Sequence, residues 1–175
     1  MELAHRIRLL TVDDASAWAQ RRFEALTAHP LLFGAAPPRD TSRLIEFVCT
    51  QIARAESGVC GAFTAARLDG IVGVFRESGV KARHKAVIWG MYVSPEARRR
   101  GVGRALLNAA VEQARHWPGV EQVHLSVSEA SGSARTLYER EGFASWGREP
   151  RAISWAGGFA DETHMLLDLR AESAG

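Results

Sequence analysis

The chain of 175 residues has only two cysteines, Cys49 and Cys60, and no long apolar run. Two cysteines outside a C-x-x-C pair are too few for a disulfide framework or a zinc site, so we expect no metal. A membrane-crossing helix needs about eighteen consecutive apolar residues, and the charged start MELAHRIRLL lacks the apolar core of a signal peptide. We therefore expect a cytoplasmic protein with no membrane partner.

Lysine is almost absent, because Lys81 and Lys85 are the only lysines among 22 basic residues. An excess of arginine suits phosphate or nucleic-acid binding, since arginine makes bidentate contacts to phosphate. The formal net charge is only +2, however, and the densest arginine run contains no aromatic residues, so we expect no nucleic-acid partner. The overall skew, with abundant alanine and glycine, is typical of GC-rich codon usage, and only one local cluster is informative.

Hydrophobic periodicity predicts one α+β domain over residues 1–175, with a core of about residues 6–169. The expected order is β-α-α-β-β-β-α-β-α-β-β, which mixes hairpins with crossover helices and so differs from a doubly wound sheet. Asp69-Gly70 is expected to form a hairpin turn. The expected strands are 6–11, 59–68, 71–77, 85–93, 122–127, 143–155 and 163–169, and the expected helices lie near 13–29, 41–52, 102–116 and 131–141.

The most informative stretch is the expected turn after residues 85–93, where Gly101-Val102-Gly103 opens a helix. Glycines let a ligand approach the backbone closely, and the positive end of a helix favours an anion such as pyrophosphate. Cations at a helix start oppose the helix dipole unless an anion binds between them. Four such cations stand here: Arg98, Arg99, Arg100 and Arg104.

Two other phosphate-binding motifs fit this stretch poorly. A dinucleotide fingerprint needs a third glycine where Leu106 stands, and no acidic residue follows at the usual distance. The P-loop sequence GxxxxGK[ST] is absent. A solvated, arginine-rich turn is the alternative without a ligand.

A second stretch, Ser131-Gly-Ser-Ala134-Arg-Thr-Leu137-Tyr138-Glu-Arg-Glu-Gly142-Phe143, follows a strand. It is similar to the N-x-x-A-x-x-L-Y-x-x-x-G-F pattern of the GNAT superfamily of acyl-CoA N-acyltransferases. Arg98-Arg-Arg-Gly101-Val-Gly103 resembles the same family's pyrophosphate motif, [RQ]-x-x-G-x-[GA]. The resemblance covers residues 6–169 and implies a GNAT-like mixed sheet, mostly antiparallel, flanked by helices.

The resemblance implies acetyl-CoA as cosubstrate, with the strand before the turn extended by the pantetheine arm. Backbone amides from Arg99 to Arg104 would wrap the pyrophosphate. Ser131 stands where the family usually has a pantetheine-contacting Asn, and capping the following helix is an equally good role for it. The expected cofactor-binding residues are Met91, Tyr92, Val93, Arg98, Arg99, Arg100, Gly101, Val102, Gly103, Arg104, Ser131 and Tyr138.

Tyr138 matches the family tyrosine that acts as general acid toward the CoA sulfur, although a half-buried structural tyrosine is the alternative. Many members carry a Glu on the strand before the pyrophosphate turn, but Lys85–Val93 contains no carboxylate. The candidates for a general base are therefore Glu129, Glu77 and His84. A water chain, or an amine that is already neutral, would also serve.

These expectations predict an acetyl-CoA-dependent N-acetyltransferase acting on a primary amine, in the first place one of a small molecule. The alternatives are a protein N-terminal or lysine acetyltransferase and a non-catalytic acyl-CoA-binding regulator. We expect a monomer or homodimer. The loop 31–40 and the hairpin around 150–161 would shape the acceptor site, and the basic run Lys81–Lys85 would suit an acceptor with a carboxylate or phosphate.

Overall fold

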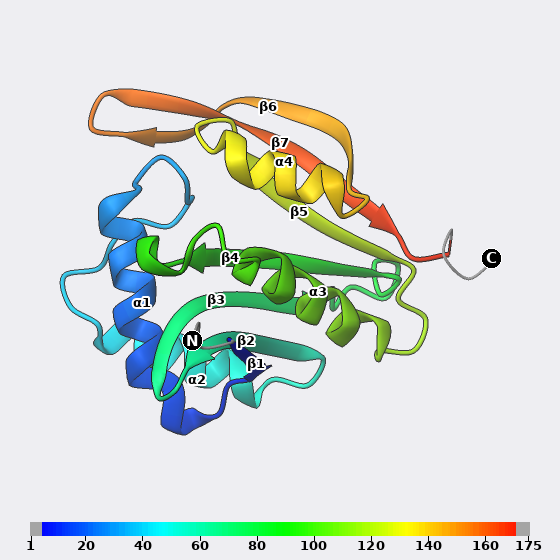
Figure 1. Cartoon of the computed structure of the whole chain (residues 1–175). Helices are drawn as coiled ribbons and strands as arrows, with labels where there is room; N and C mark the ends of the chain where they lie inside the picture. Colours follow the sequence, from blue (N-terminus) through cyan, green and yellow to red (C-terminus); the bar gives the residue numbers. More distant parts are fainter. Residues whose placement is uncertain (1–4, 171–175) are drawn as a thin grey trace.

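The computed structural model describes residues 5–170, which form one seven-stranded sheet flanked by four α-helices (Figure 1). Spatial order in the sheet is β1-β2-β3-β4-β5-β7-β6, and only the β4–β5 pair is parallel. The α+β class, the element order and the mostly antiparallel sheet are confirmed. The elements are β1 (Arg6–Leu9), α1 (Ala15–Ala28), α2 (Ser42–Ala53), β2 (Ser57–Thr64), β3 (Arg67–Arg76), β4 (Lys85–Val93), α3 (Val102–Arg115), β5 (Gln122–Ser128), α4 (Gly132–Arg140), β6 (Ala144–Trp155) and β7 (Gly158–Asp168).

Strands β2 and β3 are buried on both faces, because they alternate apolar residues between two helical layers. On β2, Cys60 and Ala62 belong to the cluster that contains α3, whereas Val59 and Phe63 belong to the cluster of α1 and α2. Side chains on a strand alternate between the faces with period two, so a strand buried on both faces is nearly continuously apolar. The run Ser57–Thr64 shows this composition.

The central feature of the sheet is the short contact between its two parallel strands. β4 pairs with β5 only from Lys85 to Val87, opposite Gln122 to His124. Beyond these residues the two strands diverge and leave a wedge between them (Figure 1). The β5-facing edge of the rest of β4 therefore lacks a ladder partner and can pair with a ligand.

A β-bulge at Gly90 resets the direction of the side chains at the end of β4. Tyr92 pairs with Ile71 but Trp89 pairs with Gly73, so β4 holds one residue more than β3 over this interval. Gly90 takes the left-handed conformation, with φ of +63°. A one-residue shift exchanges the two faces of a strand. Met91 consequently packs on the α3 side, and Tyr92 packs on the α1 side.

The predicted hairpin turn at Asp69-Gly70 is wrong, because both residues lie inside β3. The chain turns instead at Ala65-Ala66, where Ala65 has φ of +52°. Asp69 is fully buried and lies 2.6 Å from Arg67 Nε and 3.2 Å from His5 Nε2. The Arg67 guanidinium, with the His5 ring beside it, makes the burial of this carboxylate tolerable, and local turn propensity did not reveal these partners.

Two glycine substitutions test the packing of β3 against β4. A methyl group at Gly73 would lie 2.1 Å from the Trp89 ring, whereas one at Gly34 would meet nothing within 4 Å. We expect Gly73→Ala to lower the free energy of unfolding by about 1–3 kcal/mol through overpacking. Gly34→Ala should leave it unchanged or raise it by about 0.4–1 kcal/mol, because alanine restricts the unfolded chain. Urea unfolding followed by tryptophan fluorescence measures both, and equal effects would contradict this packing.

Candidate active site

A cavity of about 740 Å³ lies where β4 and β5 separate. Its walls come from β4, the turn before α3, β5, α4 and the segment that follows α1. Of the twelve residues predicted to bind the cofactor, all but Arg100 line this cavity. Those eleven residues are Met91, Tyr92, Val93, Arg98, Arg99, Gly101, Val102, Gly103, Arg104, Ser131 and Tyr138.

The turn before α3 forms a cradle of backbone N–H groups. Arg99 and Gly101 both adopt left-handed backbone conformations, with φ of +61° and +75°. Such turns curve successive N–H groups toward one point, and the first N–H groups of a helix have no partner within that helix. α3 begins at Val102, so its positive end faces the cavity here. This arrangement suits a diphosphate.

The missing side chain of Gly103 keeps the cradle open. A Cβ atom at this position would lie 3.3 Å from both Leu137 Cδ2 and Met91 Cε. These two side chains come from α4 and β4, so Gly103 lies where three elements converge on the cavity. A larger residue would have to project into the space that a ligand needs.

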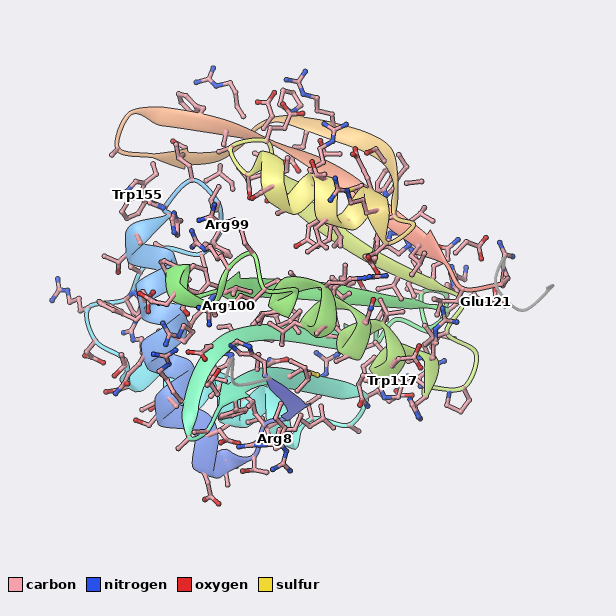
Figure 2. All side chains as sticks on the ribbon, in the orientation of Figure 1. Arg8, Arg99, Arg100, Trp117, Glu121 and Trp155 are labelled. Atoms are coloured by element: carbon pink, nitrogen blue, oxygen red, sulfur yellow. The ribbon has the colours of Figure 1, made fainter. Side chains whose placement is uncertain are left out.

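The arginines around the cradle differ in what they contact. Arg98 donates from Nε to the Val93 carbonyl oxygen at 3.0 Å, and its Nη2 lies 3.3 Å from His29 Nε2. Arg104 is paired with Glu141, at 2.8 Å. Arg99 and Arg100 project to different sides of the turn (Figure 2). Arg98 is thus fixed by the protein before any anion binds.

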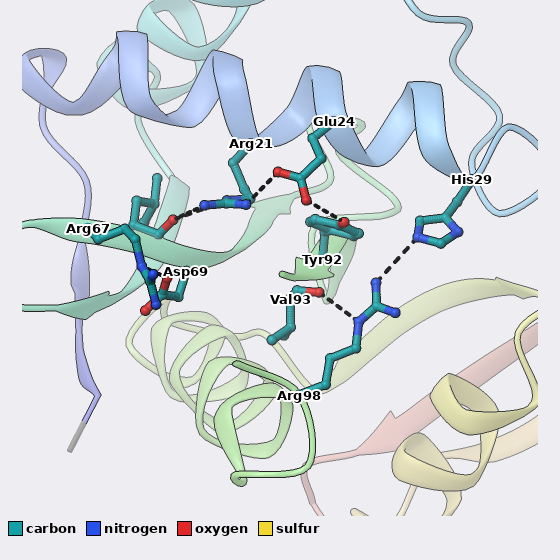
Figure 3. Close-up of polar contacts among 9 residues, drawn as sticks. Arg21, Glu24, His29, Arg67, Asp69, Tyr92, Val93 and Arg98 are labelled. Atoms are coloured by element: carbon teal, nitrogen blue, oxygen red, sulfur yellow. Dashed lines mark hydrogen bonds and ion pairs between the residues drawn. The ribbon is translucent and has the colours of Figure 1, made fainter. Parts of the chain in front are cut away.

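A polar network joins α1 to the end of β4 (Figure 3). The Tyr92 hydroxyl donates to Glu24 Oε1 at 2.9 Å, and Glu24 also pairs with Arg21. Arg21 in turn donates to the Leu68 carbonyl oxygen on β3 at 2.9 and 3.1 Å. Burial, together with the neighbouring Glu24 carboxylate, raises the pKa of Tyr92. The network fixes the distance between α1 and the cavity wall.

Tyr138 projects from α4 to the opposite wall and is buried. Its hydroxyl lies 3.7 Å from the sulfur of Met91, and its ring lies 6.0 Å from that of Phe143. Desolvation by burial raises the pKa of Tyr138 to about 12. The phenol is therefore protonated at neutral pH and can donate a proton within the cavity.

Two serines mark the mouth of the cavity beside α4. Ser131 occupies the N-cap position of α4, but its side chain makes no capping hydrogen bond. The buried Ser128 donates from its hydroxyl to the Leu31 carbonyl oxygen at 2.7 Å. This bond holds the segment after α1 against the end of β5. The two strands that bound the wedge, β4 and β5, are therefore both held by hydrogen bonds from the side of α1.

None of the three candidate bases lines the cavity. Glu129 lies 3.0 Å from Arg148 and is within hydrogen-bond distance of Thr163. Glu77 and His84 flank Lys85, at the end of β4 that is paired with β5. The basic run Lys81–Lys85 lies at this end too, and none of its residues lines the cavity.

Sequence reasoning missed His29, which lines the cavity at the end of α1, and Arg22, which lies behind its wall. The available signal was helical spacing, since Trp18, Arg22 and Leu26 recur every four residues on the buried side of α1. An arginine on such an apolar stripe is unusual.

Within residues 5–170, no group of three or more His, Cys, Asp or Glu side chains is placed to hold a metal. No helix in that range is long and apolar enough to cross a membrane.

A mixed sheet that opens between its parallel strands, with an anion cradle at the opening, defines the acyl-CoA N-acyltransferase class of fold. The chain belongs to the acetyltransferase (GNAT) family, whose model matches residues 16–143.

Similar proteins include a mycothiol acetyltransferase from Thermobispora bispora, 30% identical over 154 residues. The match covers 83% of this chain but 49% of that protein, so the chain spans about half the length of this curated relative. A phosphinothricin acetyltransferase from Sinorhizobium meliloti in complex with acetyl-CoA has a TM-score of 0.82 at 20% identity, covering 95% and 89% of the chains. A ribosomal-protein-alanine N-acetyltransferase from Brucella melitensis also has 0.82, at 21% identity, covering 94% and 99%. The two structures share the fold.

Two tyrosine substitutions test the network between α1 and β4. Tyr92→Phe removes a hydroxyl that donates to a carboxylate, and we expect it to lower the free energy of unfolding by about 1–2 kcal/mol. Tyr138→Phe removes a buried hydroxyl that faces only a weak sulfur acceptor, and should change stability by less than about 0.5 kcal/mol. Urea denaturation measures both variants. A larger loss for Tyr138→Phe would contradict the assigned contacts.

Proposed function

We propose that the chain is an acetyl-CoA-dependent N-acetyltransferase that acetylates a primary amine of a small molecule. The observation that carries this proposal is that one cavity joins the anion cradle, the open edge of β4 and the protonated Tyr138. Membership of the GNAT family supports it. So does the fold shared with the Sinorhizobium meliloti acetyltransferase, which was determined with acetyl-CoA.

The wall residues fit acetyl-CoA by their chemistry. The cradle from Arg99 to Arg104 would hold the pyrophosphate through backbone N–H groups, with Arg98 beside it. The unpaired edge of β4 at Met91–Val93 would hold the pantetheine arm as an added strand. Bound there, acetyl-CoA supplies an activated thioester.

Acetyl transfer needs the carbonyl polarised and the leaving sulfur protonated. A backbone N–H near Met91–Val93 would stabilise the negative charge that develops on the carbonyl oxygen. The amine nitrogen forms a bond to the carbonyl carbon, the carbon–sulfur bond breaks, and the Tyr138 hydroxyl donates its proton to the sulfur. The proton that the amine loses leaves to solvent, from which Tyr138 is reprotonated, so the charges balance.

The amine is proposed to react from its neutral form without a side-chain base. Glu141 is the only carboxylate lining the cavity among the described residues, and it is paired with Arg104. His29 is the only imidazole there, and its Nε2 is placed to accept a hydrogen bond from the permanently charged Arg98. The lone pair needed for base catalysis is then already engaged.

A small acceptor is favoured because Leu32, Phe33 and Trp89 wall one side of the cavity, which we call the acceptor side. A protein N-terminus or lysine is the alternative acceptor, and the Brucella melitensis neighbour carries a protein substrate in its name. Incubating the protein with acetyl-CoA and an amine panel, and measuring released thiol, tests the proposal. Tight CoA binding without turnover of any amine would favour a non-catalytic regulator.

Gly103→Glu tests the cradle. The carboxylate would enter the space proposed for the pyrophosphate, so we expect CoA affinity to fall at least about 100-fold, measured by calorimetry. Asn108→Glu is the matched control, because it adds the same charge to the exposed surface of α3 outside the cavity lining. It should bind CoA like the unmodified protein. Similar losses in both variants would point to general electrostatics and contradict the cradle.

Tyr138→Phe tests the proposed acid. We expect kcat to fall about 100-fold while the dissociation constant for CoA changes less than about threefold. The unmodified enzyme should show no alkaline loss of kcat from this group up to about pH 10, because the pKa of Tyr138 is about 12. Steady-state thiol assays measure kcat, and rapid mixing with CoA measures the dissociation constant. An unchanged kcat would remove Tyr138 from proton transfer.

A further inference from the structure

Arg22, in the middle of α1, is a buried cation without a carboxylate contact among those the structure shows. Only 8% of the residue is exposed, and its Nη1 atom is shielded from solvent with no hydrogen-bond partner. The guanidinium instead stacks over the Phe33 ring, 4.7 Å from its centroid. Desolvation by burial lowers the pKa of Arg22 to about 10, so the side chain is still charged at neutral pH.

The guanidinium lies directly behind the acceptor side of the cavity. Phe33, whose ring stacks on it, lines that cavity, and so does Gly90. A Cβ atom at Gly90 would lie 3.4 Å from Nη1, 3.6 Å from Cζ and 4.0 Å from Nη2. The absent side chain therefore leaves this wall thin at the guanidinium, and the left-handed φ of the bulge favours a glycine there.

An arrangement of this kind costs free energy that an apolar residue would avoid. Buried polar atoms are almost always hydrogen-bonded, and a buried charge is usually paired. Arg21, the preceding residue, satisfies this rule through Glu24 and the Leu68 carbonyl. Arg22 departs from it where α1 packs behind the cavity-lining residues Phe33 and Gly90. An unsatisfied group at such a place indicates a ligand that completes it.

We propose that Arg22 is an acceptor-binding residue that pairs with a carboxylate, so that the acceptor is an amino acid or a similar amine bearing a carboxylate. The proposal rests on the N-acetyltransferase function proposed above. A guanidinium offers two parallel N–H donors that match the two oxygens of a carboxylate. The acceptor carboxylate would reach it past Gly90, with the Phe33 ring displaced from the guanidinium face. The amine would then lie on the cavity side of Gly90, toward the open edge of β4.

Arg22 thus takes the role of binding an anionic acceptor, which the sequence analysis assigned to the basic run Lys81–Lys85. That run lies at the closed, paired end of β4, whereas Arg22 lies beside the bulge near the open end. A carboxylate fits better than a phosphate group, because a single guanidinium balances one negative charge and a phosphate monoester carries up to two.

The test compares acceptors that differ only in the carboxylate. Each proteinogenic amino acid is assayed beside its carboxamide, and aminoalkylphosphonates are included. For the accepted amino acids, kcat/KM should exceed that of the amide about 10- to 100-fold, as expected from hydrogen bonds to a charged group. In Arg22→Met this ratio should fall close to one. Arg43→Met removes the same charge from the exposed surface of α2, outside the cavity lining, and should keep the ratio of the unmodified enzyme.

A binding measurement separates this inference from the function on which it rests. Calorimetry of the same acids and amides is carried out on the CoA-loaded protein, where no acetyl group is available. Preferential binding of acids that is lost in Arg22→Met supports the Arg22 site even if no amine is turned over. Turnover of amines with equal binding of acids and amides overturns the site but retains the acetyltransferase.

Stability gives a further discriminating readout. Replacing an unpaired buried charge by an apolar residue of similar length should leave the melting temperature unchanged or raise it. If Arg22→Met does not fold, Arg22→Lys decides, because it keeps the charge but loses the two-pronged geometry and should reduce the acid-to-amide ratio several-fold. An unchanged ratio in Arg22→Lys and Arg22→Met, or a preference for phosphonates over carboxylates, overturns the proposal.

Discussion

The site depends on the three residue pairs that join β4 to β5. Parallel strands usually continue side by side, because each unpaired backbone group loses a hydrogen bond. Here the ladder stops after Val87, and the strands are held apart by what packs on either side of them. α3 and the Tyr138 side of α4 lie on one face, and α1 lies on the other. The resulting wedge exposes a strand edge inside the molecule instead of at its periphery, where an open edge would invite aggregation.

The bulge at Gly90 decides what that open edge presents to the cavity. With regular alternation after Trp89, Met91 would face α1 and Tyr92 would face α3. The extra residue exchanges them, so Met91 meets the Tyr138 hydroxyl and Tyr92 meets Glu24. The bulge glycine also adds no side chain of its own beside the Arg22 guanidinium. One inserted residue thus sets the contacts of both walls, which is consistent with the frequent occurrence of bulges beside active sites.

Sequence patterns predicted the elements and the glycine turn before α3 well, because both depend on local chemistry. The period-two and period-3.6 runs gave the strand and helix order, and Gly101-x-Gly103 located the turn that bends left-handed at Arg99 and Gly101. The patterns failed where distant residues decide. Asp69 carries a turn signal, yet it lies within a strand and contacts Arg67 and His5. The predicted role of Lys81–Lys85 required β4 and β5 to separate at the end of β4 next to that run. The two strands separate at the other end, and packing far from the run fixes which end it is. The twelve cofactor-binding residues and the acid Tyr138 stay predictions, as does the choice of base.

The absence of a carboxylate base and the orphaned guanidinium have a common physical explanation. An amino acid in water holds its ammonium and carboxylate close together, and their attraction favours the protonated amine. A carboxylate paired with Arg22 would give much of that attraction to the guanidinium. This pairing would lower the pKa of the bound amine toward the neutral, nucleophilic form. Recognition of the acceptor would then take over part of the work expected, from the family resemblance, of a glutamate on the strand before the turn. In this chain the corresponding strand carries Trp89, Gly90 and Met91, and the charge lies one layer behind them on α1.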